Sequence, residues 1–398
     1  MGTHFRHLST LLAALTLFSR TAAAFDISGE ATIETRYFPD SPHYLEQFRG
    51  AQTTLSVTPE LRWIMGNGDR LTLIPHLRHD SRDDERSDFD LREAYWLHVD
   101  GDWEWLVGVN RTFWGVTESR HLVDIVNQTD EVAAFDGEEK LGQPMINLTT
   151  RRDWGSLGLF VLPGFRERTF AGPEGRLRPA QAVDTDRARY ESGAGKQHID
   201  LALRYAHYIG DWDIGLHTFH GTGREPRLIP EGGRLVPHYD QIRQVGLDLQ
   251  YTREAWLWKL EALTRRQNGD NFNAAVAGFE YTLYQIVDSN ADLGLLVEYL
   301  YDGRNPNPAV APPTPFDNDL FLGARFALND TQDTTLLAGV VIDRDDQSRI
   351  LSVEAERRLG SHWTVELEGR WFEQIATDGD LAVYAGDSFV SIRLARHF

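Results

Sequence analysis

The chain has 398 residues, of which 40 are Lys or Arg, 60 are Asp or Glu and none is Cys. This length can form a large core or several domains. The formal charge of −20 argues against a nucleic-acid partner, because the phosphate backbone would be repelled. Without Cys, no disulfide framework can hold the fold together.

The first 24 residues have the pattern of a secretory signal peptide. Arg6 stands in a short polar start, an apolar run covers residues 11–18, and three consecutive Ala end at Ala24. The apolar run is shorter than the roughly 20 residues that a membrane-spanning helix needs, and the alternative is a buried N-terminal helix. Cleavage after Ala24 would leave residues 25–398 as the mature chain. We predict that this mature chain forms a single domain.

From residue 26 onward, apolar and polar side chains alternate with a period of two, which predicts β-strands with one apolar face. In 51–65, Leu55, Val57 and Trp63 share one parity, and polar residues share the other. Such a stretch is longer than a typical globular strand of about 5–6 residues. Comparable stretches follow at 70–80, 89–99, 198–205, 245–252, 292–301, 362–371 and 387–398. In 89–99 we expect one face to carry Phe89, Leu91, Tyr95, Leu97 and Val99.

The connections between these strands alternate between short and mostly long. Short turn signals occur at 66–69, 100–103, 152–155, 209–212, 289–292, 329–333 and 359–362. The longer polar or Pro-rich connections include 111–143, 164–196, 221–238 and 304–317. This order predicts an antiparallel meander of about 16–18 strands with all tight turns at one end.

Two architectures can use such strands. A soluble β-sandwich or β-helix would bury the apolar parity, whereas a membrane barrel would turn it to lipid and the polar parity to a lumen. Charged residues on the inward parity and an alternating C-terminal strand favour the barrel. Aromatic girdles near strand ends favour it too, and the Trp residues in question are Trp63, Trp103, Trp105, Trp212, Trp256, Trp258, Trp363 and Trp371. We therefore predict an all-β, closed, antiparallel up-and-down transmembrane β-barrel.

The leader, the alternating strands and the closing FVSIRLARHF together resemble the Gram-negative outer-membrane β-barrel proteins, in particular the porin-like channels. The resemblance implies location in the outer membrane, contact with its lipid and lipopolysaccharide, and passive passage of small hydrophilic solutes. It also implies a monomer or a homotrimer, no cofactor and no enzymatic activity. The barrel-assembly machinery would read the last strand, whose signal residues would be Val390, Ile392, Leu394 and Phe398.

By the same resemblance, the third long connection, 111–143, would fold into the barrel and narrow it. Opposed charges across such a constriction select small polar solutes. The predicted constriction residues are Arg111, Arg120, Asp124, Asp130 and Glu131 on the connection, facing Arg62, Arg78 and Arg92 on the wall. We expect a short helix in ESRHLVDIV, 118–126. The alternative is a loop packed on the rim with solvated charges.

The sequence is also compatible with two other functions for such a barrel. A barrel-embedded hydrolase would need a catalytic group, for which His217, His220 and Asp240 are the candidates, and a plugged structural or receptor barrel is a third class. The Arg-rich segment 164–196 could attract anions or lipopolysaccharide phosphates, or be a solvated loop. No complete phosphate-binding, calcium or zinc motif is present, so we predict no catalytic, cofactor or metal residues.

Overall fold

The computed structural model describes residues 24–398; apart from Ala24, the predicted signal peptide lies outside the described residues. Eighteen strands form one antiparallel sheet in which each strand pairs with the next in the barrel, and β21 pairs with β1. The barrel strands are β1 (Ala24–Phe38), β2 (Gly50–Ile64), β3 (Arg70–Asp80), β4 (Asp88–Asp100), β5 (Trp103–Asn110), β6 (Gln143–Arg152), β7 (Gly155–Pro163), β9 (Ile199–Ile209), β10 (Trp212–Thr222), β13 (Gln241–Arg253), β14 (Trp256–Gln267), β15 (Asp270–Leu283), β16 (Asp292–Asp302), β17 (Asn318–Ala327), β18 (Thr335–Asp343), β19 (Arg349–Leu359), β20 (Trp363–Glu373) and β21 (Phe389–His397). The predicted closed up-and-down barrel is confirmed.

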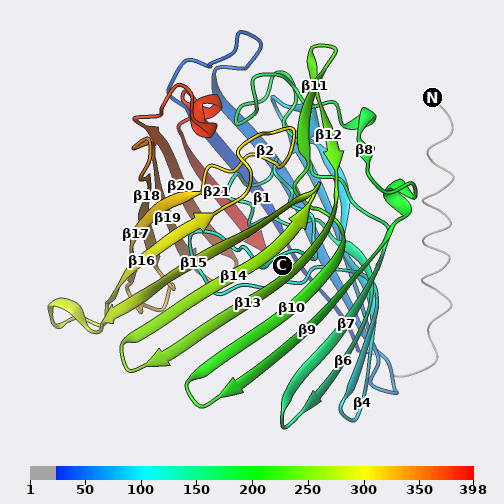
Figure 1. Cartoon of the computed structure of the whole chain (residues 1–398). Helices are drawn as coiled ribbons and strands as arrows, with labels where there is room; N and C mark the ends of the chain where they lie inside the picture. The colour runs from blue at the N-terminus through cyan, green and yellow to red at the C-terminus, as the bar shows by residue number, and fades with distance from the viewer. Residues whose placement is uncertain (1–23) are drawn as a thin grey trace, which may run out of the picture.

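Tight turns gather at one end of the barrel and longer connections at the other (Figure 1). The long connections also carry a separate three-stranded sheet of β8 (Arg189–Tyr190), β11 (Arg227–Glu231) and β12 (Arg234–Tyr239). Short 3₁₀ turns complete the described structure: η1 (Asp84–Arg86), η2 (Thr185–Arg187), η3 (Gly195–Gln197), η4 (Ile286–Asp288) and η5 (Asp380–Tyr384). Within residues 24–398, no helix has the length and apolar character needed to cross a membrane.

The outer face of the barrel is apolar, as the alternation predicts. On β2, for example, Leu55 is 51% exposed, whereas its neighbour Thr54 is 6% exposed and faces inward. Of the eight Trp residues named above, all but Trp371 lie at the tight-turn end of their strands. A closed barrel satisfies all backbone groups and can therefore hold this apolar surface in a membrane.

The seam between the first and last strands is regular. Ile33 stands opposite Leu394, and the backbone N–H and C=O of Phe398 pair with those of Gly29 at 3.0 Å. Gly29 has φ of 152°, and a Cβ there would lie 2.6 Å from the carbonyl oxygen of Thr58. Only Gly fits this close approach without strain.

A strap of residues 164–198, here called the mouth segment, crosses the long-connection end from β7 towards the seam. The Arg176 guanidinium, 1% exposed, donates to Asp387 at 2.6 Å and to the carbonyl oxygen of Phe48 at 3.3 Å. Asp387 precedes β21 and Phe48 precedes β2, so Arg176 ties together the connections on both sides of the seam.

Two predictions about the strands are wrong in detail. β4 does not keep one parity: the pairing of Ile74 with Glu93 and of Pro75 with Leu91 leaves Arg92 as an extra residue. Beyond this bulge Tyr95 and Leu97 turn inward, because a one-residue insertion reverses the facing of every following side chain. The connection between β14 and β15 is also a tight turn, although it lies at the long-connection end.

Candidate functional site

The connection between β5 and β6, residues 111–142, lies inside the barrel and is called the inner segment. Two buried wall carboxylates hold it by its backbone. Glu261 on β14 accepts from the N–H groups of Val116, Thr117 and Val123 at 2.7, 3.0 and 3.1 Å. Glu298 on β16 accepts from the N–H groups of residues 118 and 119, both at 2.8 Å. Buried carboxylates require such donors.

These contacts explain why the predicted helix in 118–126 is wrong. In a helix, most backbone N–H groups would be consumed by internal hydrogen bonds. Here the N–H groups of Ser119 and Val123 point to wall carboxylates instead, and residues 118–126 form only turns, bends and irregular backbone. The wall therefore selects an irregular conformation over the local helical preference.

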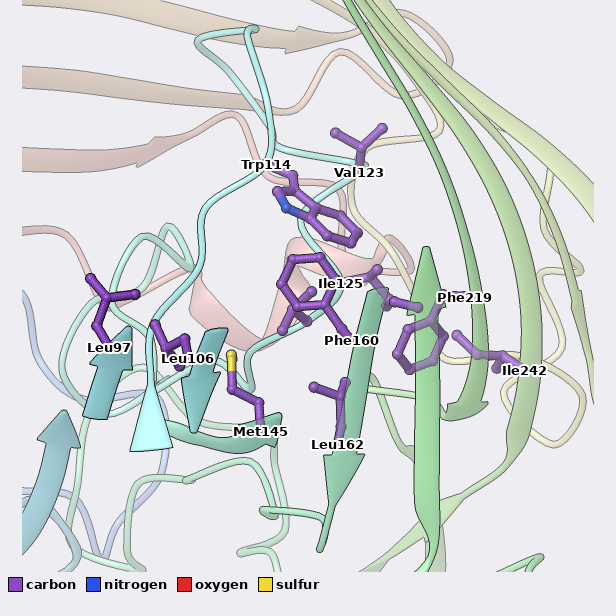
Figure 2. Packing of buried hydrophobic residues seen from close by; sticks show 12 residues of the cluster. Leu97, Leu106, Trp114, Val123, Ile125, Met145, Phe160, Leu162, Phe219 and Ile242 are labelled. Atoms are coloured by element: carbon purple, nitrogen blue, oxygen red, sulfur yellow. The ribbon is translucent and has the colours of Figure 1, made fainter. Parts of the chain in front are cut away.

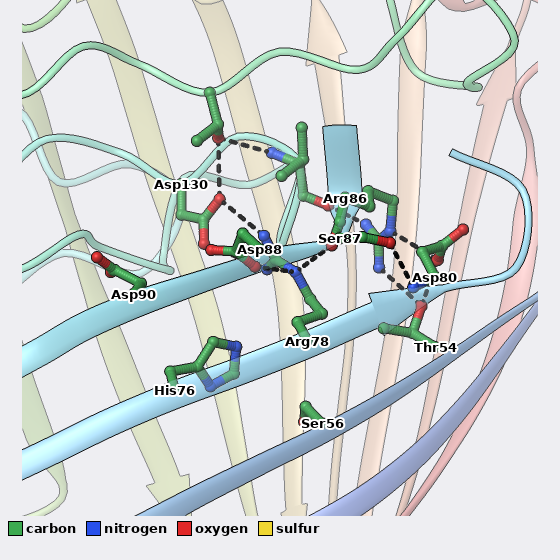
Figure 3. A network of polar contacts seen from close by, with 12 residues as sticks. Thr54, Ser56, His76, Arg78, Asp80, Arg86, Ser87, Asp88, Asp90 and Asp130 are labelled. Atoms are coloured by element: carbon green, nitrogen blue, oxygen red, sulfur yellow. Dashed lines mark hydrogen bonds and ion pairs between the residues drawn. The ribbon is translucent and has the colours of Figure 1, made fainter. Parts of the chain in front are cut away.

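On the opposite wall, Arg78 of β3 and Arg92 of β4 converge on Asp130 of the inner segment. Their guanidinium nitrogens lie 3.2 and 2.6 Å from Asp130 Oδ2, and Figure 3 shows Arg78 reaching Asp130 from the wall. Burial opposes ionisation of Asp130, but the two guanidinium groups outweigh it and lower the pKa to about 2. The predicted residues Arg78, Arg92 and Asp130 thus come together as one buried ionic cluster.

The other predicted constriction residues form separate pairs. Arg120 lies 3.2 Å from Asp302, Asp124 lies 3.3 Å from Lys140, and Glu131 lies 3.2 Å from Arg168. Arg111 pairs with Glu93 at 3.4 Å, and Arg62 pairs with Glu60. The structure therefore distributes these five residues around the inner segment and the wall rather than across one gap.

The underside of the inner segment is apolar and packs on an apolar part of the wall (Figure 2). Trp114 is 3% exposed, and its ring centroid lies 5.5 Å from that of Phe160. The cluster consists of Leu97, Leu106, Trp114, Val123, Ile125, Val126, Met145, Phe160, Leu162, Ala202, Phe219 and Ile242. We call its strand residues, on β4 to β13, the apolar wall. In this sector the inward parity is apolar, in contrast to the charged inward residues that the alternation predicts for many strands.

A different sector, formed by β19, β20, β21 and β1, faces inward with carboxylates. Register places Glu354 opposite Glu368 and Glu356 opposite Glu366, and we call these four residues the acidic wall. Arg370 reaches Glu354 and Glu368 at 2.6 and 3.1 Å, and it also reaches Asp136 of the inner segment at 2.7 Å.

The acidic wall keeps access to solvent. The side chains of Glu354 and Glu366 are 44% and 35% exposed. Arg393 pairs with Glu366 and with Glu30, the latter at 2.7 Å. Because directly opposed like charges destabilise a sheet, water and the two guanidinium groups must compensate these carboxylates. Four wall glutamates with Asp136 and Glu30 against two Arg leave a formal charge of −4.

The hydrolase candidates are not assembled. His217 faces inward and is 3% exposed, its ring contacting Trp114 at 5.1 Å between centroids. His220 lies on the outward, exposed parity, and Asp240 is held by Arg227 at 2.7 Å. Among residues 24–398, no three or more His, Asp or Glu side chains are grouped so that they could hold a metal ion.

The arginines of the mouth segment are compensated within the chain. Arg166, Arg168, Arg176, Arg187 and Arg189 each pair with a carboxylate, and Arg178 donates to the carbonyl oxygens of residues 173, 179 and 180. These internal contacts argue against a role of this segment in attracting anions.

The two anchoring glutamates and the acidic wall were not predicted from the sequence. Glu261, Glu298 and the β19–β20 glutamates look like ordinary inward polar residues in an alternating strand. The spacing of Glu354, Glu356, Glu366 and Glu368 is a signal only when the register of the β19–β20 hairpin is known. The tight turn between the strands could have supplied that register.

A closed 18-stranded barrel, an apolar outer face with Trp near the strand ends and an ionic interior define the fold class: the protein is a transmembrane β-barrel of the outer-membrane type. No protein-family model matches the sequence, and a search of curated proteins found no match either.

Solved structures show the same fold at low identity. OccK7 (OpdD) of Pseudomonas aeruginosa is 11% identical with a TM-score of 0.52, over 95% of this chain and 99% of that chain. Wzi of Escherichia coli, an outer membrane protein involved in group 1 capsule assembly and described as a carbohydrate-binding β-barrel, is 9% identical with a TM-score of 0.52, over 98% and 86%.

Proposed function

We propose that the protein is a channel for passive passage of small hydrophilic solutes, narrowed by the inner segment. The passage runs between the exposed face of that segment and the acidic wall. The observation that carries this proposal is the partial exposure of inward ionised groups such as Glu354 and Glu366, in a barrel whose 18 strands enclose more space than side chains alone fill.

The charge of this passage predicts which ions it favours. Net negative charge beside a narrow aqueous path favours cations over anions. The predicted constriction residues then have two roles: Arg78, Arg92 and Asp130 fix the inner segment, and Arg111 and Arg120 border the path.

Export and assembly are part of the same proposal. The leader, residues 1–24, directs export, and the outward-facing Val390, Ile392, Leu394 and Phe398 form the signal read by the barrel-assembly machinery. The exposure of Ile392 and Phe398, 50% and 51%, supports a role in recognition before the barrel enters lipid. The active form is a monomer or a homotrimer.

Conductance of the refolded mature chain in planar bilayers tests the channel. Discrete, long-lived conductance steps with a reversal potential on the cation side are expected in a KCl gradient. Protein that migrates as a folded barrel in unboiled gel samples, yet gives no steps, would contradict the proposal.

A second candidate, a plugged barrel that binds a ligand at its mouth, is favoured by one observation. The mouth segment crosses the long-connection end and is fixed by the buried Arg176–Asp387 pair. For this candidate we expect no steps from the whole chain, and steps after Arg176→Ala loosens the strap.

A further inference from the structure

Two arginines stand side by side on the outer surface of the barrel. Arg243 is the first exposed residue of β13 at the long-connection end, and Arg266 is the last exposed residue of β14 at the same end. The strand register places them directly opposite each other. The same row continues to His220 on β10, opposite Arg243, and to Asn271 on β15, opposite Arg266. All four residues are exposed.

No carboxylate of the described chain compensates this pair. Across residues 24–398, the ion pairs and side-chain hydrogen bonds of the structure include neither Arg243 nor Arg266. Arginines of the mouth segment, in contrast, find acidic partners or carbonyl oxygens. Directly opposed like charges destabilise a sheet, so two arginines held opposite each other by the strand register, without an acid, call for an anion from outside the chain.

Directly beside the arginine pair the outer wall is hollowed. An open apolar groove of about 380 Å³ follows the same strands towards the membrane centre. Its floor consists of small residues, since Ala262 stands opposite Ala275. The side chains that line it are Leu216, Val245, Leu247, Ala262, Thr264, Asn273, Ala275 and Tyr301.

The arginine pair lies at the level of the lipid headgroups along the membrane normal. Trp256, at the tight-turn end of β14, and Arg266 are ten residues apart on the same face. At about 3.4 Å per residue and a strand tilt of about 40°, this separation spans about 25 Å across the membrane. That equals the apolar band of outer-membrane barrels, so Arg266 lies at the outer-leaflet headgroups when Trp256 lies at the inner interface.

We propose that this face binds a phosphate-bearing lipid of the outer leaflet, with its phosphate between Arg243 and Arg266 and an acyl chain in the groove beside them. Arginine suits this role because its planar fork donates two parallel hydrogen bonds to phosphate. The turn between β14 and β15 is tight, so the strands themselves present both exposed arginines at the headgroup level.

Native mass spectrometry of the mature protein in detergent micelles, titrated with bisphosphorylated lipid A, tests the site. The double variant Arg243→Gln, Arg266→Gln is expected to weaken binding at least about tenfold, because two charge-assisted contacts are lost. Arg253→Gln is the matched control, since Arg253 is outward and exposed on the same strand but lies at the opposite end. It is expected to bind like the wild type.

A groove-filling variant, Ala275→Phe, tests the contribution of the acyl chain independently of the two arginines. It is expected to weaken lipid A binding while both arginines remain. In a separate competition experiment, inorganic phosphate at millimolar concentration is expected not to displace lipid A. Equal binding by the double variant, or an equal loss in Arg253→Gln, overturns the proposal. Competition by inorganic phosphate overturns the lipid assignment, and a dimer lost in the double variant without lipid would assign the face to a second copy. Gel mobility of unboiled samples verifies that each variant is folded.

Discussion

The apolar wall and the acidic wall are built from strands of the same barrel, yet their inward faces differ completely. Met145 and Phe160 of the apolar wall are 2% and 7% exposed under the inner segment. In the acidic wall, the side chain of Glu354 is 44% exposed. On the outside, both sectors show the same apolar parity.

The comparison shows that the inward parity of a barrel need not be polar where the chain itself supplies a cover. Trp114 and Val123 of the inner segment remove the apolar wall from water. Burial of such side chains contributes about 25 cal/mol per Å². The segment therefore leans towards β4–β13 and leaves the β19–β21 side as the solvated one.

The largest effect is expected from Trp114→Ala on the apolar side. Loss of this 3% exposed ring should lower the free energy of unfolding by about 4 kcal/mol, since the cavity lies among residues that cannot collapse together. Urea unfolding in detergent micelles, followed by circular dichroism, measures it. Trp258→Ala, whose ring is 47% exposed on the outer face, is the control, and an equal loss there would contradict the difference between the two faces.

A somewhat smaller loss, about 3 kcal/mol, is expected from Asp130→Asn. Arg78 and Arg92 would lose the buried carboxylate that they share and keep only Asp88 and Asp90, at 3.1 and 3.3 Å, although the amide oxygen still accepts one hydrogen bond. Trypsin cleavage after Arg120 should accelerate as the inner segment detaches. Asp136 pairs with Arg370 and is more exposed than Asp130. The variant Asp136→Asn should therefore change the free energy of unfolding by less than about 1 kcal/mol.

The attachment of the inner segment should weaken at alkaline pH. Burial lowers the pKa of His121, but Glu138 and Glu261 outweigh it and raise the pKa to about 10. A raised pKa means that the contribution is complete below the ordinary value of about 6.5 and is lost as pH rises through 10. Channel noise at pH 10.5 should exceed that at pH 6.5 by about tenfold in event frequency. His121→Phe should abolish this dependence; an unchanged profile would contradict the assignment.

On the acidic side, neutralisation should alter selectivity more than stability. The double variant Glu354→Gln, Glu368→Gln should reduce the ratio of potassium to chloride permeability by about twofold, because two negative charges leave the passage. Reversal potentials in a KCl gradient measure the ratio. Asp333→Asn, in the turn between β17 and β18, should leave it unchanged.

Much of the barrel could be predicted from the sequence because its strongest constraint is local. Lipid on the outside forces every second residue to be apolar, so strands, their number and the outward residues follow from parity. The final strand is an example, since Val390 and Ile392 do lie on the exposed outer face.

The interior could not be predicted equally well. Which side chains point inward, and what they contact there, depends on residues that are distant in the sequence. Pro75 was the available sign of the β4 bulge, since Pro lacks the N–H that a regular ladder would use. The Asn268-Gly269 pair between β14 and β15 is a strong hairpin signal in the sequence and marks the tight turn at the long-connection end. The irregular course of residues 118–126, however, depends on Glu261, which is more than 130 residues away.

The contact between Arg176 and Asp387 has a consequence for the order of folding. Asp387 lies directly before β21, so its final position exists only once the last strand has met the first. The mouth segment can therefore dock only on a cylinder that is already closed, and it then acts as a latch over the join. Refolding should accordingly proceed in two stages, with gel-shifted barrels forming first and protease resistance at residues 164–198 arriving later.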